Sequence, residues 1–230
     1  MAAIVDLCFE WSGEEFRGCF FRDAATGRIL AEAEDGDYGS AILRCDGREY
    51  TVAQRMKRLE RLPVPTPYPL SSKGKKTIGF EILEKDERIG IYYPDAVTVG
   101  KLGVFKKNMA VTVYSLFGRN YTVYRIGFAG EPWHYYRLMD EEMETVAMLR
   151  RNYSRKIPSR ATVYVEEEAY LPLAMVVCAG EMLAGVGCGL VSYGRDPSAG
   201  NYISILEAEK NMIDRAFLDR VREQAGVKGE

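Results

Sequence analysis

Histidine is almost absent from this chain of 230 residues, because His134 is the only one. A metal site built from several histidines is therefore excluded. As a general base, His134 would need an orienting partner, but Trp133, Tyr135 and Tyr136 surround it with aromatic rings instead. No nucleophile with its base and no metal-ligand cluster stands out elsewhere. We expect a protein that is not an enzyme and uses neither a metal nor another cofactor.

Paired cysteines and a secretory leader are also missing. The five cysteines form an odd set without any C-x-x-C spacing, and reduced thiols in a cytosolic protein are the simplest interpretation. Residues 1–11 contain no basic segment ahead of an apolar stretch, which is what a secretory signal requires. We therefore expect a cytoplasmic location.

A strong excess of charge of one sign is absent as well. The net charge is −2, so no global field would draw the protein to nucleic acid. Hydrophobic residues make up 47% of the chain, which is ordinary for a globular protein with a sizeable core. An anionic partner would have to be bound by a local basic patch.

What the chain has in abundance is hydrophobic alternation with a period of two, which is typical of β-strands with one buried face. Asp46-Gly47 separates two alternating runs and predicts a tight hairpin. Strand candidates are Ile4–Trp11, Phe16–Arg22, Ile29–Glu34, the two sides of the hairpin in Ala41–Val52, Thr77–Leu83, Arg88–Tyr93, Val97–Phe105, Met109–Phe117, Asn120–Phe128, Trp133–Met139, Thr145–Leu149 and Thr162–Glu166. Because no long helices separate them, we expect a mainly β protein of roughly twelve antiparallel strands, closed as a barrel or folded as a sandwich.

Two segments depart from this alternation. Gln54–Leu62 predicts one short basic helix. Pro63–Ser72, with four prolines in ten residues, predicts an extended connector. The connector is either a loop within one domain or a boundary between two.

The apolar run Ala169–Val191 predicts a single hydrophobic helix. A helix that is apolar all round either spans a membrane or is enclosed by protein. Glu181 would cost about 2.5 kcal/mol or more near the centre of a bilayer, and four glycines weaken the second half of the run as a helix. We therefore expect a protein-enclosed helix over about Leu171–Leu183 and no transmembrane span.

This order of elements resembles the tubby C-terminal-like superfamily, which includes the LURP-one-related proteins and the phospholipid scramblases. The resemblance is carried by Gly118–Phe128 (GRNYTVYRIGF), Trp133–Met139, Thr145–Leu149 and Tyr164, and it covers about Thr77–Leu183. It implies a closed antiparallel barrel of about twelve strands around the hydrophobic helix, with residues 1–190 forming that domain. It also implies lipid binding, since tubby domains bind phosphoinositides. Scramblase-type calcium binding is not carried over, because no ligand motif matches.

Residues 191–230 extend past the point where that family usually ends. Ser204 and Glu207 form a capping box, and Gly226 stands where a helix would stop. We expect an amphipathic helix over about 204–225. Its apolar stripe is formed by Leu206, Ile213, Phe217 and Val221. The stripe packs on its own domain or mediates assembly, including formation of a homo-oligomer.

Basic clusters are the main functional lead. The segment from Arg150 to Arg160 contains five cations and no acid, and lesser clusters lie around Lys75 and at Lys106-Lys107. The candidate ligand-binding residues are Arg150, Arg151, Arg155, Lys156, Arg160, Lys73, Lys75 and Lys76. Such groups bind phosphate or anionic head groups, or they form a solvated loop that keeps strand ends from aggregating.

The sequence therefore predicts a non-catalytic binding module for anionic phospholipid head groups or another phosphorylated ligand, bound through surface basic loops. Such a protein would be cytoplasmic or peripheral at the membrane. The alternative is a structural or adaptor protein that assembles through its C-terminal helix.

Overall fold

The computed structural model describes residues 1–12, 15–36, 40–70, 74–102, 105–127, 133–152, 161–182 and 210–227. Twelve strands are β1 (Ala3–Ser12), β2 (Glu15–Asp23), β3 (Ile29–Asp35), β4 (Ala41–Cys45), β5 (Arg48–Glu60), β6 (Lys76–Glu84), β7 (Glu87–Leu102), β8 (Phe105–Leu116), β9 (Arg119–Ile126), β10 (Trp133–Met139), β11 (Thr145–Asn152) and β12 (Ala161–Val165). The helices are η2 (Glu168–Tyr170), α1 (Leu171–Met182) and α3 (Arg215–Gln224).

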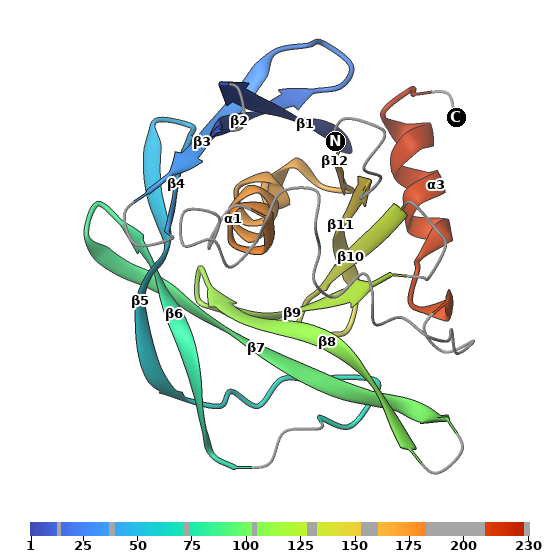
Figure 1. Ribbon diagram of the computed structural model, residues 1–230. Helices are drawn as coiled ribbons and strands as arrows, with labels where there is room; N and C mark the ends of the chain where they lie inside the picture. Colours follow the sequence, from blue (N-terminus) through green and yellow to red (C-terminus); the bar gives the residue numbers. More distant parts are fainter. Residues whose placement is uncertain are drawn as a thin grey trace.

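The strands form one closed antiparallel barrel in which each strand pairs with its neighbours in the chain, and β1 pairs with β12 to complete the ring (Figure 1). The barrel rather than the sandwich is thus confirmed. Asp46 and Gly47 both have positive φ angles, of 55° and 72°, as a type I′ hairpin turn requires.

The predicted central helix is confirmed as α1. Figure 1 shows it inside the ring of strands, and all residues from Leu173 to Ala179 are buried. They pack against the inward side chains of the barrel, including Val52, Val123 and Leu149. Of the described helices, none is both long enough and apolar enough to cross a membrane.

The predicted helix at Gln54–Leu62 is wrong. Residues up to Glu60 belong to β5, which pairs with β6 through Lys57 and Gly79, Arg58 and Ile78, and Leu59 and Thr77. Met56, Leu59 and Leu62 have a spacing compatible with one helical face. Hydrogen bonds to a neighbouring strand outweigh this weak local preference.

The predicted strands Arg88–Tyr93 and Val97–Phe105 are largely one strand, because β7 runs without a break through Pro94. Proline is tolerated there because β7 pairs with β6 only up to Tyr92, so that side of the strand needs no donor at Pro94. The proline-rich connector lies beside this free edge. Leu70 bridges to Val97, and the Thr98 N–H donates to the Pro69 carbonyl at 2.9 Å. The connector thus joins two neighbouring strands of the barrel.

A second hydrophobic cluster lies on the outside of the barrel under α3. Phe217 and Val221 of α3 are fully buried there with Ile4, Met148 and Tyr164 of the strands. The helix is shorter than the predicted 204–225. Lys210 and Asn211 are helical, the chain turns at Met212 and Ile213, and a new helix begins at Arg215. The turn occurs because the carboxylate of Asp214 accepts the Phe217 N–H as an N-cap. Ser204 and Glu207 lie outside the described residues.

Candidate binding face at the barrel mouth

The predicted cluster around Arg150 is divided by β11. Alternate residues of a strand point to opposite faces, so Arg151 shares the inner face with Ala147 and Leu149 while Arg150 lies on the outer face. Arg151 is buried, and the Arg150 guanidinium lies 3.7 Å from the ring centre of Trp133. Both side chains are engaged within the protein. Their role in anion binding stays a prediction, and Arg155, Lys156 and Arg160 lie outside the described residues.

Lys75 and Lys76 are exposed at the start of β6, whereas Lys73 lies outside the described residues. A further exposed cation, Arg58, lies on the neighbouring strand β5, where it pairs with Ile78, two residues after Lys76. We call Arg58, Lys75 and Lys76 the basic rim. Glu60 lies opposite Lys76 in the strand register without forming an ion pair with it, so the rim has three cations and one neighbouring acid. The sequence did not single out Arg58, because no alternation of apolar and polar residues marks 54–62 as a strand.

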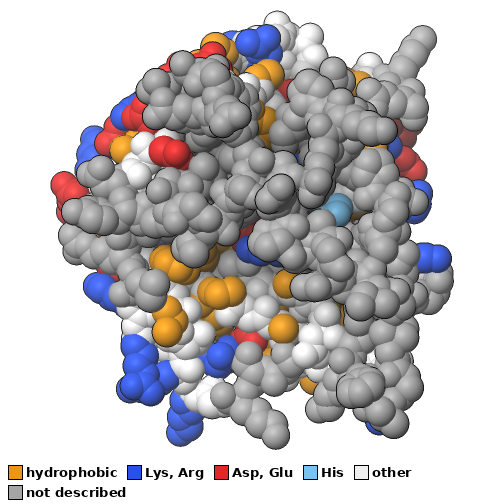
Figure 2. All heavy atoms as spheres, viewed as in Figure 1, with side chains coloured by type: hydrophobic (Ala, Val, Ile, Leu, Met, Phe, Trp, Pro, Cys, Tyr) orange, Lys and Arg blue, Asp and Glu red, His pale blue; other side chains and the backbone are white. Residues whose placement is uncertain are grey.

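The basic rim borders an exposed apolar surface on the inner side of β6 and β7. Ile82 and Phe80 point inward, so Ile78 lies on the same face. Ile78 nevertheless keeps 58% of its surface exposed, and Pro94, two residues after the inward Tyr92, is exposed as well. We call Ile78, Phe80 and Pro94 the apolar floor. Figure 2 shows hydrophobic side chains on this face over β6 and β7, with Lys and Arg side chains towards its lower left edge.

Deeper in the barrel the apolar floor continues into three stacked aromatic rings from β6, β7 and β8. Phe80 stacks on Tyr92 with ring centres 5.2 Å apart, and Tyr92 stacks on Tyr114 at 5.0 Å. Burial raises the pKa of both tyrosines, so their hydroxyls stay protonated. The stack provides a rigid aromatic wall.

The wall ends at an ion pair between the barrel and the central helix. Glu181 of α1 accepts from Arg125 Nε at 2.7 Å and from the Tyr114 hydroxyl at 3.0 Å. The Glu181 side chain is only 1% exposed, whereas that of Arg125 is 43% exposed. The carboxylate raises the pKa of Arg125. The pair fixes the end of α1 and leaves no uncompensated charge at this position.

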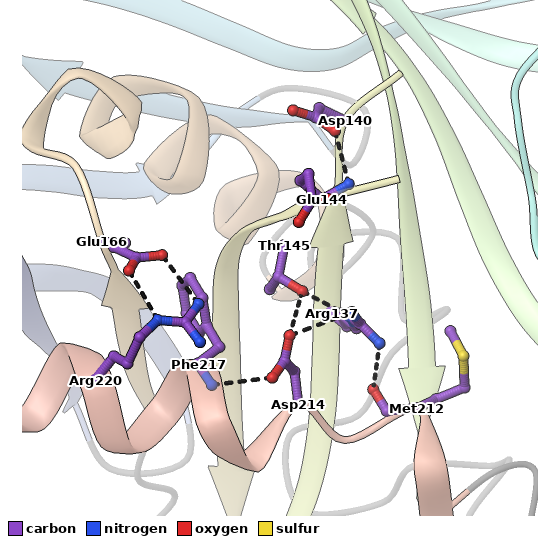
Figure 3. Close-up of polar contacts among 9 residues, drawn as sticks. All are labelled: Arg137, Asp140, Glu144, Thr145, Glu166, Met212, Asp214, Phe217 and Arg220. Atoms are coloured by element: carbon purple, nitrogen blue, oxygen red, sulfur yellow. Dashed lines mark hydrogen bonds and ion pairs between the residues drawn. The ribbon is translucent and has the colours of Figure 1, made fainter. Parts of the chain in front are cut away.

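A second polar cluster fastens α3 to the outside of the barrel (Figure 3). Asp214 accepts from the Thr145 hydroxyl at 2.7 Å and from Arg137 Nη2 at 3.2 Å, while Arg137 Nε donates to Thr145 at 2.8 Å. Arg220 binds Glu166 through Nε at 3.0 Å and Nη2 at 3.3 Å. These contacts attach α3 to the barrel, so the cluster has a structural role.

A crevice of about 270 Å³ lies beside this attachment and is lined mainly by carboxylates, among them Asp140, Glu144 and Glu167. Within the described ranges, no group of three or more His, Cys, Asp or Glu side chains could hold a metal ion. The crevice therefore does not support a metal centre.

Reactive thiols are also lacking among the described cysteines that are buried. Burial raises the pKa of Cys19 to about 12, and it raises that of Cys178 further. Both stay protonated at neutral pH and behave as small apolar side chains.

Comparison with known proteins finds no matching family model, curated protein or solved structure. The resemblance to the tubby C-terminal-like superfamily therefore stays a prediction.

Proposed function

We propose that this protein is a non-catalytic binding module for an anionic ligand, either the head group of an anionic phospholipid or another phosphorylated molecule. The observation that carries the proposal is the basic rim. Arg58, Lys75 and Lys76 are all exposed where β5 and the start of β6 pair, and none of them forms an ion pair with a carboxylate in the described part of the chain.

Other cations of the same region differ from the basic rim, because they already have acidic partners. Lys57 pairs with Glu81 at 2.6 Å, and Arg61 pairs with the buried Asp95. These two charges are satisfied within the protein and stabilise β5 and the connector. The three rim cations have no such structural role, so their charge is available to a ligand.

An anionic membrane surface attracts each nearby Lys or Arg by about 1 kcal/mol. Three cations would contribute about 3 kcal/mol, which corresponds to roughly a hundredfold in affinity. Glu60 opposes part of this attraction, and salt screens it. The module would therefore associate reversibly with a membrane as a peripheral protein.

Sedimentation with phosphatidylcholine vesicles, with and without phosphatidylserine, tests the proposal at low and physiological salt. The wild type is expected to bind the anionic vesicles in a salt-sensitive manner. The triple variant R58A/K75A/K76A is expected to lose roughly a hundredfold at low salt. The matched control R44A/R48A/R88A removes three other exposed arginines, which already have acidic partners, and is expected to bind normally. Equal binding by the rim and control variants would refute the proposal.

A further inference from the structure

The apolar floor is unusual because its side chains are exposed on the inward face of β6 and β7, at and just past the last residue pair of these two strands. Phe80 pairs with Tyr92, and the next inward residues on the two strands are Ile78 and Pro94. Deeper along the same strand, Ile82 is fully buried against the core that contains α1. The apolar surface therefore emerges continuously from the core and ends in solvent at Ile78.

The basic rim begins where the apolar floor ends. Arg58 pairs directly with Ile78, and Lys76 lies two residues before Ile78 on the same face of β6. A surface with cations at one end and hydrocarbon along its length complements a molecule with an anionic head and an apolar tail. Glu60 is the one acid that faces this surface from β5, and it lies opposite Lys76, beyond Ile78.

The position of the apolar floor favours a single amphiphilic molecule over the surface of a bilayer. Phe80 and Tyr92 lie on the concave side of the barrel, where a flat bilayer cannot follow the surface, although it can touch the basic rim. A single extended chain can lie along the strand. Four residues separate Lys76 from Phe80, so the path is about 14 Å long, comparable to an alkyl chain of medium length.

We propose that the apolar floor binds the hydrocarbon chain of a single-chain anionic amphiphile, such as a fatty acid, with the anionic head at the basic rim. The inference rests on the proposed function, because the same three cations bind the head. It adds a second contact, in which the chain covers Ile78 and Pro94 and extends towards the Phe80–Tyr92 stack.

Isothermal titration calorimetry with octanoate, decanoate and dodecanoate below their micelle concentrations tests this assignment. A chain lying on a face buries about half of its surface, so affinity is expected to rise about twofold per added CH₂. Selectively labelled isoleucine methyl groups provide a second readout, in which decanoate is expected to shift the Ile78 resonance and leave Ile29 unchanged.

The variant Ile78→Asp is expected to lose at least about tenfold in decanoate affinity, because it places a carboxylate in the chain's path. Ile29→Asp is the matched control, since Ile29 is also exposed but lies at the start of β3. Ile78→Leu should bind normally. Affinity that does not depend on chain length, or equal losses in the Ile78→Asp and Ile29→Asp variants, would overturn the inference.

Vesicle sedimentation separates this inference from the proposed function. If vesicles still bind through the rim while decanoate shows no dependence on chain length, the rim function stands and the assignment of the floor is wrong. If R58A/K75A/K76A binds decanoate as the wild type does, the head does not lie at the rim and the assignment is equally wrong. Loss of decanoate affinity in both the rim variant and Ile78→Asp would support the two contacts together.

Discussion

Both Nε and Nη2 of Arg125 lie 2.7 Å from the same carboxylate oxygen of Glu181. This contact joins β9 to the last turn of α1, and the Tyr114 hydroxyl bonds to the other oxygen of the same carboxylate. The central helix is thus held in the barrel by a polar contact at one end as well as by apolar packing. A charge that would oppose membrane insertion becomes part of the core.

The two members of this pair are expected to respond differently to substitution. Arg125→Met leaves an almost fully buried carboxylate without its partner and should lower the free energy of unfolding by about 3–5 kcal/mol. Glu181→Gln leaves an arginine that still reaches solvent, and it should cost only about 1–2 kcal/mol. Urea denaturation followed by circular dichroism measures both. Equal losses of unfolding free energy in the two variants would contradict this dependence on burial. Arg88→Met is the control for removal of an exposed arginine.

Stability should fall in acid partly through Asp214. Burial alone would raise the pKa of this carboxyl, but hydrogen bonds from Phe217 and Thr145 and the charge of Arg137 lower it below its ordinary value of 3.8. A carboxyl whose pKa is lower in the folded state stabilises the protein fully above its unfolded pKa. That contribution is lost as the pH falls through the folded value.

Asp214→Asn tests this dependence, because asparagine still caps a helix but does not titrate. The difference in unfolding free energy between wild type and variant is expected to be present at pH 7 and to shrink below about pH 4. Urea titrations at a series of pH values measure it. Asp219→Asn is the control, since Asp219 is exposed on the same helix. A difference that is constant with pH would contradict the assignment.

The adaptor alternative depends on whether the apolar side of α3 is available to a partner. Ile213, Phe217 and Val221 are buried on the chain's own barrel, so the structure predicts that a full-length chain does not dimerise through them. Size-exclusion chromatography with light scattering is expected to show a monomer. A full-length dimer that becomes a monomer after removal of residues 203–230 would support assembly through the helix instead.

The basic segment from Arg150 to Arg160 begins inside β11, so variants in β11 and variants beyond it test different properties. Arg151→Ala should destabilise the fold, because it removes a buried and engaged side chain. A loss of vesicle binding in that variant would therefore report unfolding. The variant R155A/K156A/R160A tests the predicted anion cluster directly. If the cluster binds anions, vesicle affinity should fall by about 1 kcal/mol per removed cation with no change in melting temperature. Unchanged affinity would assign the binding to the basic rim alone.

Local patterns were sufficient for most of the architecture. Alternation located nearly all the strands, and Asp46-Gly47 located a hairpin whose positive φ angles the structure confirms. The apolar composition around Val176 predicted α1, which begins at the expected residue, Leu171. These features depend on neighbours in the chain, so they can be derived from the sequence.

Features that depend on distant partners could not be derived in that way. The strand character of Arg58 depends on hydrogen bonds to β6, some twenty residues later. The restart of the C-terminal helix depends on Asp214 contacting Thr145 and Arg137, which belong to other strands. No local period encodes these contacts.

Hydrophobic periodicity is a local property of the chain, so it was enough to predict a β protein with one enclosed apolar helix. Which charges are available to a ligand depends instead on the tertiary structure. It buried Arg151, paired Arg125 with Glu181, and placed Arg58 on the strand that pairs with the start of β6. The reason is that strand register, set by pairing across the whole barrel, determines which face each side chain occupies and which neighbour it meets.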